Sequence, residues 1–368
     1  MNSTIFVSIA SYRDNICPVT LESIFLRAKN PSRVFIGICQ QNTPEDPDCR
    51  DTALRKLPQY RNHVRVVRLR HDEAKGPTYA RYLCATLYDQ EDYFLQIDSH
   101  CKFVRGWDEL MIGMILDLKR AGYAKPVLSH YTPSIDDYKE EPSKQESVTT
   151  ICEAWFTKDN LISLLGAGWN PHEDLPRPNA YIAGGMFFCE GSFLKEIPFD
   201  PDLDYLFIGE ELVQSIRFYT HGWDIFSPNV ITLYHFYTRE KDPKFWENKN
   251  INASPASQKV RYLLGLDTDL SKLTDRQKDS IEIYGLGKVR TLQDYYDYAG
   301  IDIKKKRVTK NMCTLPREEI LTIVSPTTKK KKSNSSSASA VRNYHYLWLV
   351  VLFVVLVLLA VWAMYRNV

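Results

Sequence analysis

The feature that most constrains the fold is an alternation of short apolar runs with amphipathic segments over the first hundred residues. Helical periodicity follows Pro18 and Pro77, and proline suits the first turn of a helix. The apolar runs have the length of buried strands and cover residues 5–10, 34–38, 64–69 and 93–97. The resulting β-α-β-β-α-β order predicts an α/β domain with a mostly parallel, doubly wound sheet.

The chain after residue 100 gives a coarser prediction. An amphipathic helix is expected over 107–120, where apolar residues recur every three or four positions and form a core-facing stripe. A second helix is expected over 210–220. Strands are expected at 127–131, 147–156, 181–188 and 223–234, loops at 136–146 and 170–179, and mostly helices over 243–303. The sequence contains neither a Gly-x-Gly-x-x-Gly motif nor a Walker loop.

A charge-free segment at 346–365 has the length of about 20 residues that a helix needs to span a bilayer core. Trp348 and Trp362 lie near its two ends, where aromatic rings prefer the membrane interface. Four lysines at 329–332 and a serine-rich stretch precede it. Because basic residues favour the cytosolic side, we expect a single-pass C-terminal tail anchor with the large domain facing the cytosol.

Composition excludes one class of partner. A formal net charge of +2, with 44% hydrophobic and 25% charged residues, is ordinary for a globular protein and predicts no nucleic-acid-binding surface. The eight cysteines include no Cys-x-x-Cys pair. With the predicted cytosolic placement we expect them to be reduced thiols, and we expect no structural zinc site.

Polar residues at the ends of predicted strands point to a metal site. Asp98 and His100 come directly after the strand at 93–97, so alternate side chains of that turn can converge on one ion. His235 follows another predicted strand and is a candidate third ligand. The turn at 11–15 also follows a strand, and open α/β sheets bind ligands beyond the carboxyl ends of their strands. Carboxylate and imidazole together suit Mn²⁺, with Mg²⁺ as the alternative.

Several segments in the same order resemble the cytosolic hydroxyproline N-acetylglucosaminyltransferases, which are related to the polypeptide N-acetylgalactosaminyltransferases. The stretch from Gly76 to Arg81, followed by 96–101, is similar to the donor half of the latter family. The segments similar to the former are Ser11-Tyr12-Arg13-Asp14, Asp98-Ser99-His100, Ala183-Gly184-Gly185, Phe207-Ile208-Gly209-Glu210-Glu211 and Leu286-Gly287-Lys288-Val289-Arg290-Thr291-Leu292. The resemblance covers roughly residues 5–303.

The resemblance implies a GT-A fold, a UDP-sugar donor, dependence on manganese and transfer of N-acetylglucosamine with retention of anomeric configuration to a hydroxyl of a protein. Asp98 and His100 would bind the metal, with His235 as third ligand. The implied nucleotide-sugar contacts are Ser11, Tyr12, Arg13, Arg81, Gly184 and Gly185. Glu210 and Glu211 would lie near the reacting centre and hydrogen-bond the sugar or the acceptor hydroxyl.

Two departures from the family patterns bear on substrate. The sequence has Phe207-Ile208-Gly209-Glu210-Glu211 where the galactosaminyl family has Trp-Gly-Gly-Glu-Asn, which favours the glucosaminyl relative. The predicted anchor is unusual among the cytosolic relatives and leaves open whether the acceptor is a membrane-associated protein, a glycan or a lipid. Such relatives also occur in large DNA viruses, where the membrane would belong to the host or the virion.

The expected organisation is a GT-A domain over 1–310, a basic and serine-rich linker over 311–345 and a transmembrane helix over 346–365. Within the domain we expect a nucleotide-binding half, 1–135, and an acceptor half, 145–310. Two other functions stay open: a nucleotidyltransferase on a similar sheet, and an inactive transferase that serves as a membrane-tethered binding module. Release of pyrophosphate from a nucleoside triphosphate would favour the first, and failure to bind UDP with manganese the second.

Overall fold

The computed structural model describes residues 3–142, 146–239, 242–248 and 256–324. The strands are β1 (Ile5–Tyr12), β2 (Val34–Asn42), β3 (Val64–Arg70), β4 (Tyr93–Asp98), β5 (Cys101–Phe103), β6 (Pro126–Ser129), β7 (Val148–Phe156), β8 (Ile162–Asn170), β9 (Arg177–Pro178), β10 (Met186–Glu190), β11 (Asp224–Ser227), β12 (Leu233–His235), β13 (Ile301–Asp302) and β14 (Arg307–Val308). The helices are α1 (Cys17–Arg27), α2 (Cys49–Ala53), α3 (Pro77–Ala85), α4 (Trp107–Arg120), α5 (Glu210–Thr220), α6 (Phe245–Asn248), α7 (Ala256–Leu263), α8 (Asp275–Tyr284), α9 (Leu292–Ala299) and α10 (Arg317–Val324).

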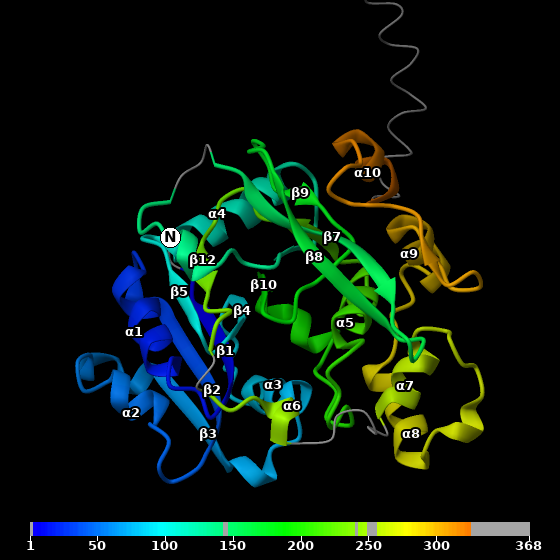
Figure 1. Cartoon of the computed structure of the whole chain (residues 1–368). Helices are drawn as coiled ribbons and strands as arrows, with labels where there is room; N and C mark the ends of the chain where they lie inside the picture. Colours follow the sequence, from blue (N-terminus) through cyan, green and yellow to red (C-terminus); the bar gives the residue numbers. More distant parts are fainter. Residues whose placement is uncertain (1–2, 143–145, 240–241, 249–255, 325–368) are drawn as a thin grey trace, which may run out of the picture. The chain divides into compact units, whose positions relative to one another are not determined.

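A central sheet of eight strands carries the fold, in the order β3-β2-β1-β4-β10-β6-β11-β9 (Figure 1). The strands β3, β2, β1 and β4 are parallel, as the alternation of runs and helices predicts. β10 lies antiparallel between β4 and β6, so β4 and β6 run in the same direction. The prediction of a mixed α/β domain with a mostly parallel sheet is therefore confirmed. The carboxyl ends of β1, β4 and β6 lie on one edge of the sheet.

Both faces of the sheet are buried at β1 and β4, which explains why these parallel strands are apolar over most of their length, whereas β3 at the edge is partly exposed and contains three arginines. Alternate residues of β1 point to opposite faces. Val7 belongs to a core that includes residues of α1 and α4, whereas Phe6 packs with Phe94 and Phe187 on the other face. The apolar stripe predicted for 107–120 lies in the first core, and α4 has the predicted bounds.

Two strand predictions are wrong in part, and strand β8 was not predicted. The expected strand over 181–188 begins only at Met186, because residues before it form a turn that approaches the site closely. The expected strand over 223–234 is two strands: β11 joins the central sheet, and β12 pairs with β5 in a separate small sheet. β8, which pairs with β7 in a long hairpin, was not predicted, because glycines 166 and 168 interrupt its apolar pattern.

The prediction that the cysteines are reduced is wrong for four of them. Cys17 is bonded to Cys49, and Cys152 to Cys313, while cysteines 39, 84, 101 and 189 are free and buried. The bonded pairs are 32 and 161 residues apart, so no local spacing marks them. The first bond joins the starts of α1 and α2, and the second joins β7 to the segment after β14.

The chain divides into two compact units, Met1–Arg317 and Glu318–Val368. Most of α10 belongs to the second unit. Among the described residues, no helix has the length and hydropathy required to cross a bilayer. The predicted membrane span over 346–365 lies outside the described residues, so it stays a prediction.

The two bonds predict a thiol count and a stability effect. Without reductant, the denatured protein should show four thiols by alkylation and mass spectrometry, and eight after reduction. The double substitution Cys152→Ser and Cys313→Ser should lower the free energy of unfolding by about 2–4 kcal/mol, because the bond closes a long loop of the unfolded chain. Reduced wild-type protein is the control, and eight thiols in the unreduced sample would contradict the pairing.

Candidate active site

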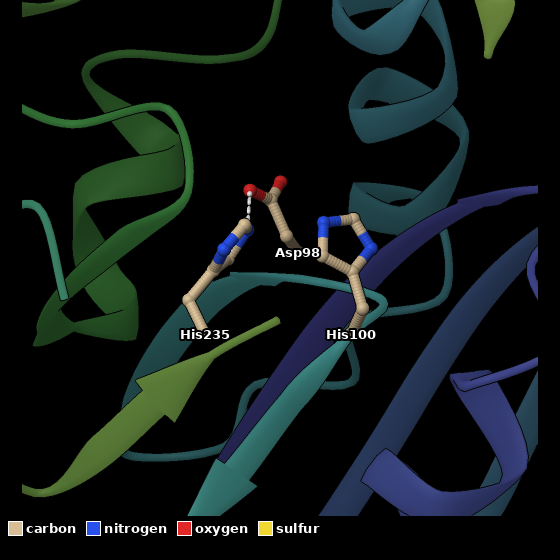
Figure 2. Close-up of side chains that lie close together, drawn as sticks. All are labelled: Asp98, His100 and His235. Atoms are coloured by element: carbon tan, nitrogen blue, oxygen red, sulfur yellow. Dashed lines mark hydrogen bonds and ion pairs between the residues drawn. The ribbon is translucent and has the colours of Figure 1, made fainter. Parts of the chain in front are cut away.

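The three predicted metal ligands converge at the carboxyl end of β4. Asp98 is the last residue of β4, His100 follows two positions later, and His235 ends β12. The pairing of β12 with β5 sets His235 opposite Cys101 and so brings it beside the turn. One candidate ligand atom from each residue lies within 4.8 Å of the others. Figure 2 shows the Asp98 carboxylate between the two imidazole rings.

The donor set fits a divalent cation. His235 Nε2 and Asp98 Oδ2 are 3.2 Å apart, close enough for both atoms to bind one ion. The centroids of the His100 and His235 rings are 4.5 Å apart, so both imidazoles reach the same space. One carboxylate oxygen and two imidazole nitrogens are ligands that Mn²⁺ and other borderline cations accept.

Electrostatics keep these groups in the states that bind metal. Burial opposes ionisation of Asp98, but the hydrogen bond with His235, the neighbouring His100 and the Arg81 guanidinium outweigh it and hold the pKa of Asp98 well below its ordinary value. Burial lowers the pKa of His235, against the opposing effect of Asp98. The site therefore offers an anionic carboxylate and an unprotonated imidazole at neutral pH.

Asp14, in the turn after β1, orients His100. Its Oδ2 accepts hydrogen bonds from His100 Nδ1 at 2.7 Å, from Ser99 Oγ at 2.6 Å and from Arg239 Nη1 at 3.2 Å. The Asp14 side chain is completely buried. Because the bond to Asp14 engages Nδ1 of His100, Nε2 is the nitrogen left for a metal. The sequence motif contained Asp14, but its spacing to Ser99 and His100 along the chain gave no sign of this contact.

The cluster opens on a cavity of about 520 Å³. Most residues that the sequence selected line it: Tyr12, Arg81, Asp98, His100, Gly184, Gly185, Glu210, Glu211 and His235. Ser11 and Arg13 do not. Ser11 is buried, and its carbonyl oxygen accepts a hydrogen bond from Gln41. Arg13 has a positive φ of 48° and is bonded to Asp46 at 2.9 Å, outside the cavity lining.

The two glycines lie against acidic side chains. A Cβ atom on Gly185 would lie 2.7 Å from Asp98 Oδ2, and one on Gly184 would collide with Glu210 Oε1. Any larger residue would therefore displace a carboxylate of the site. These two positions therefore have a reason to lack a side chain that does not depend on a bound sugar.

Arg81 lies between two carboxylates. Its Nη1 is 2.7 Å from Glu210 Oε1, and its Nη2 is 3.5 Å from Asp98 Oδ1. The Arg81 side chain is only 8% exposed, so this charge is not a solvated helix charge. The guanidinium links the metal cluster to the start of α5, where Glu210 is the first residue.

Glu211 is held by two donors next to that pair. Tyr131 Oη donates to Glu211 Oε2 at 2.7 Å, and the Gly184 N–H donates to Oε1 at 2.7 Å. Burial raises the pKa of Glu211 to about 7, and the neighbouring Glu210 adds to the effect. A carboxyl group with this pKa exchanges a proton near neutral pH.

Sequence reasoning missed several residues of the site. The cavity is also lined by His130, Tyr131, Tyr237, Arg239, Phe245 and Trp246. Tyr131 is the last residue of a predicted strand, and Tyr237 lies two residues after His235, so position at or just beyond a strand end was the available signal for both. Phe245 contacts Tyr12 edge to face, with ring centroids 5.6 Å apart, and no sequence pattern predicts this contact.

The fold and this site together define a glycosyltransferase. The family model described as glycosyltransferase (GlcNAc) matches residues 4–59 and 52–305. The match spans most of the chain, so the chain belongs to this family. The prediction that the protein is a glycosyltransferase rather than an enzyme of another class is confirmed.

Two known proteins are also similar. Human polypeptide N-acetylgalactosaminyltransferase 6 is 27% identical over 190 residues, which cover 48% of this chain and 29% of the relative. The crystal structure of GalNAc-T7 with UDP, GalNAc and Mn²⁺ matches with a TM-score of 0.53 at 14% identity, over 80% of this chain and 56% of that one. The chain thus spans much less than the full length of either protein, and the second match supports the predicted GT-A fold.

The hydrogen bond between Asp14 and His100 predicts that loss of Asp14 lowers the affinity for metal. Asp14→Ala should weaken binding of Mn²⁺ by about 10–100-fold, because His100 loses the partner that fixes its ring and tautomer. Titration of the full chain with Mn²⁺, followed by electron paramagnetic resonance of the free ion, measures the change. Asp46→Asn, in the nearby pair with Arg13, is the matched control. Equal affinities in wild type and Asp14→Ala would contradict the assignment.

The raised pKa of Glu211 predicts a pH effect on stability. The folded protein keeps the Glu211 proton up to about pH 7, whereas the unfolded chain releases it near the ordinary value of 4.5. Between these values the folded state binds more protons, so the contribution of Glu211 to stability falls as pH rises. Glu211→Gln removes this contribution. The stability difference between variant and wild type, from denaturant titrations, should shift in favour of the variant from pH 4.5 to 7; a pH-independent difference would contradict it.

Proposed function

We propose that the protein transfers a sugar, N-acetylglucosamine by preference, from a UDP-sugar to a hydroxyl group of a protein in a metal-dependent reaction with retention of configuration. The observation that carries the proposal is the cluster of Asp98, His100 and His235 in the lining of a cavity of about 520 Å³. Membership of the glycosyltransferase (GlcNAc) family supports the sugar. The ligands of the structurally similar GalNAc-T7, UDP, GalNAc and Mn²⁺, support the donor class and the metal.

The residues of the site fit these roles. Asp98, His100 and His235 would hold the cation, which when bound neutralises negative charge on the leaving diphosphate. Arg81 orients Glu210 through a hydrogen bond and Asp98 through an ion pair. Tyr131 and the Gly184 amide hold Glu211 beside the cluster, where its carboxyl group can hydrogen-bond a sugar or acceptor hydroxyl.

Acceptor and linkage are the finer part of the proposal. The pentapeptide 207–211 differs from Trp-Gly-Gly-Glu-Asn and supports a glucosaminyl rather than a galactosaminyl donor. The resemblance to hydroxyproline-specific enzymes supports a hydroxyproline acceptor. Peptides that differ only in carrying hydroxyproline, serine or threonine test this point, with radiolabelled sugar incorporation as the readout. Equal transfer to all three peptides would refute the proposed preference for hydroxyproline but not the proposed transferase activity.

Release of UDP tests the donor and the metal together. The full chain should release UDP from UDP-N-acetylglucosamine faster than from other UDP-sugars, and only with Mn²⁺ or Mg²⁺. Asp98→Asn should reduce the rate by about a hundredfold or more, since it removes a charged ligand. Asp275→Asn is the control, because Asp275 is 96% exposed and does not line the cavity. Metal-dependent release at the wild-type rate in Asp98→Asn would refute the metal assignment.

A further inference from the structure

One buried histidine of the cavity has no assigned role. His130 directly follows β6, and β6 runs in the same direction as β4. His130 and Asp98 therefore leave the central sheet at the same edge, on either side of β10. His130 lines the cavity and yet has 0% relative exposure, which places its ring in the wall rather than on the rim.

The hydrogen bonds around His130 determine which nitrogen carries the proton. Nδ1 lies 2.8 Å from Thr149 Oγ1 and 3.2 Å from the Thr149 carbonyl oxygen. The single hydroxyl proton of Thr149 is donated to the carbonyl oxygen of Tyr131 at 2.6 Å. Both Thr149 oxygens therefore act as acceptors toward the ring, and Nδ1 must be the donor. In a neutral imidazole, Nε2 is then a lone-pair acceptor.

The His130 ring is neutral at physiological pH. Burial lowers the pKa of His130 to about 4, and the hydrogen bond to the Thr149 carbonyl only partly opposes this. Within the described part of the chain, no protein group is hydrogen-bonded to Nε2. A completely buried acceptor without a donor is costly and uncommon in folded proteins. A bound molecule with an N–H or O–H group would satisfy it.

We propose that His130 is a specificity residue for the transferred sugar, and that its Nε2 accepts a hydrogen bond from a hydroxyl or amide N–H of the sugar ring of the donor. This inference rests on the proposed function. The donor sugar is favoured over the acceptor because His130 leaves the central sheet at the same edge as Asp98, where the diphosphate of the donor would be held.

The neighbours of His130 also point to the sugar. Tyr131, the next residue, donates to Glu211, which in turn holds the Gly184 amide. Gly185 lies against Asp98. A sugar attached to a diphosphate at Asp98 would therefore lie next to this chain of contacts. Thr149 on β7 fixes the ring from behind, so the acceptor lone pair is held in place before a ligand arrives.

The test compares UDP with UDP-sugar, because UDP lacks the group that would contact His130. In the full chain with Mn²⁺, calorimetry should show that His130→Phe binds UDP as wild type does but binds UDP-N-acetylglucosamine about tenfold more weakly. His130→Gln keeps an amide oxygen as acceptor and should recover part of the loss. His71→Phe is the matched control, since His71 is outside the cavity lining.

The outcomes separate this inference from the proposed function. If wild type binds neither UDP nor any UDP-sugar with Mn²⁺, the proposed function fails. If wild type binds both ligands and His130→Phe binds UDP-N-acetylglucosamine as tightly as wild type does, the role of His130 is refuted. It is also refuted if the variant loses affinity for UDP and for UDP-N-acetylglucosamine by the same factor. If UDP-sugar affinity and hydrolysis are unchanged but transfer to peptide falls, the hydrogen bond belongs to the acceptor, and the assignment to the donor sugar is wrong.

Discussion

The site depends on the pairing of two three-residue strands. β12 lies antiparallel to β5, with His235 opposite Cys101, and this register alone brings His235 to the turn that carries Asp98 and His100. A shift of one residue would turn His235 to the other face of the small sheet. Backbone bonds from His235 to Pro133 and from Phe236 to His100 hold the register from both sides. The metal cluster is thus a product of strand pairing between segments more than a hundred residues apart.

Charge compensation around Asp98 extends the cluster into the cavity. Arg81 lies between Asp98 and Glu210, Asp14 holds His100 from the opposite side, and Arg239 donates to Asp14. Each carboxylate of the site has a cationic or hydrogen-bonded partner, which offsets the cost of placing several acids together. Glu211 differs, because burial and the adjacent Glu210 raise its pKa, and the hydrogen bonds from Tyr131 and the Gly184 amide only partly oppose this.

The local sequence pattern predicted the structure correctly where a single segment determines its own conformation. The helix over 107–120 has its predicted bounds because its apolar stripe, Trp107 included, faces the core over its whole length. The prediction of one strand over 223–234 was wrong, because the apolar character of this segment suits two strands as well as one. Pro228 follows the end of the first strand. The prediction that the cysteines are reduced was wrong for a different reason: Cys152 meets Cys313 only after the intervening chain has folded.

The sequence by itself determined the α/β class, the parallel half of the sheet and the position of Asp98 and His100 after β4, because these follow from hydrophobic periodicity and chain order. It also identified His235 through its position after a predicted strand, and Glu210 and Glu211 through the family resemblance. Only the tertiary structure decided that Arg13 turns to Asp46 rather than to the cavity, that Asp14 orients His100, and that the buried Nε2 of His130 has no hydrogen-bond partner among the described residues. Those facts depend on contacts between distant segments, and hydrogen bonds and burial are properties of the packed chain that no local pattern encodes.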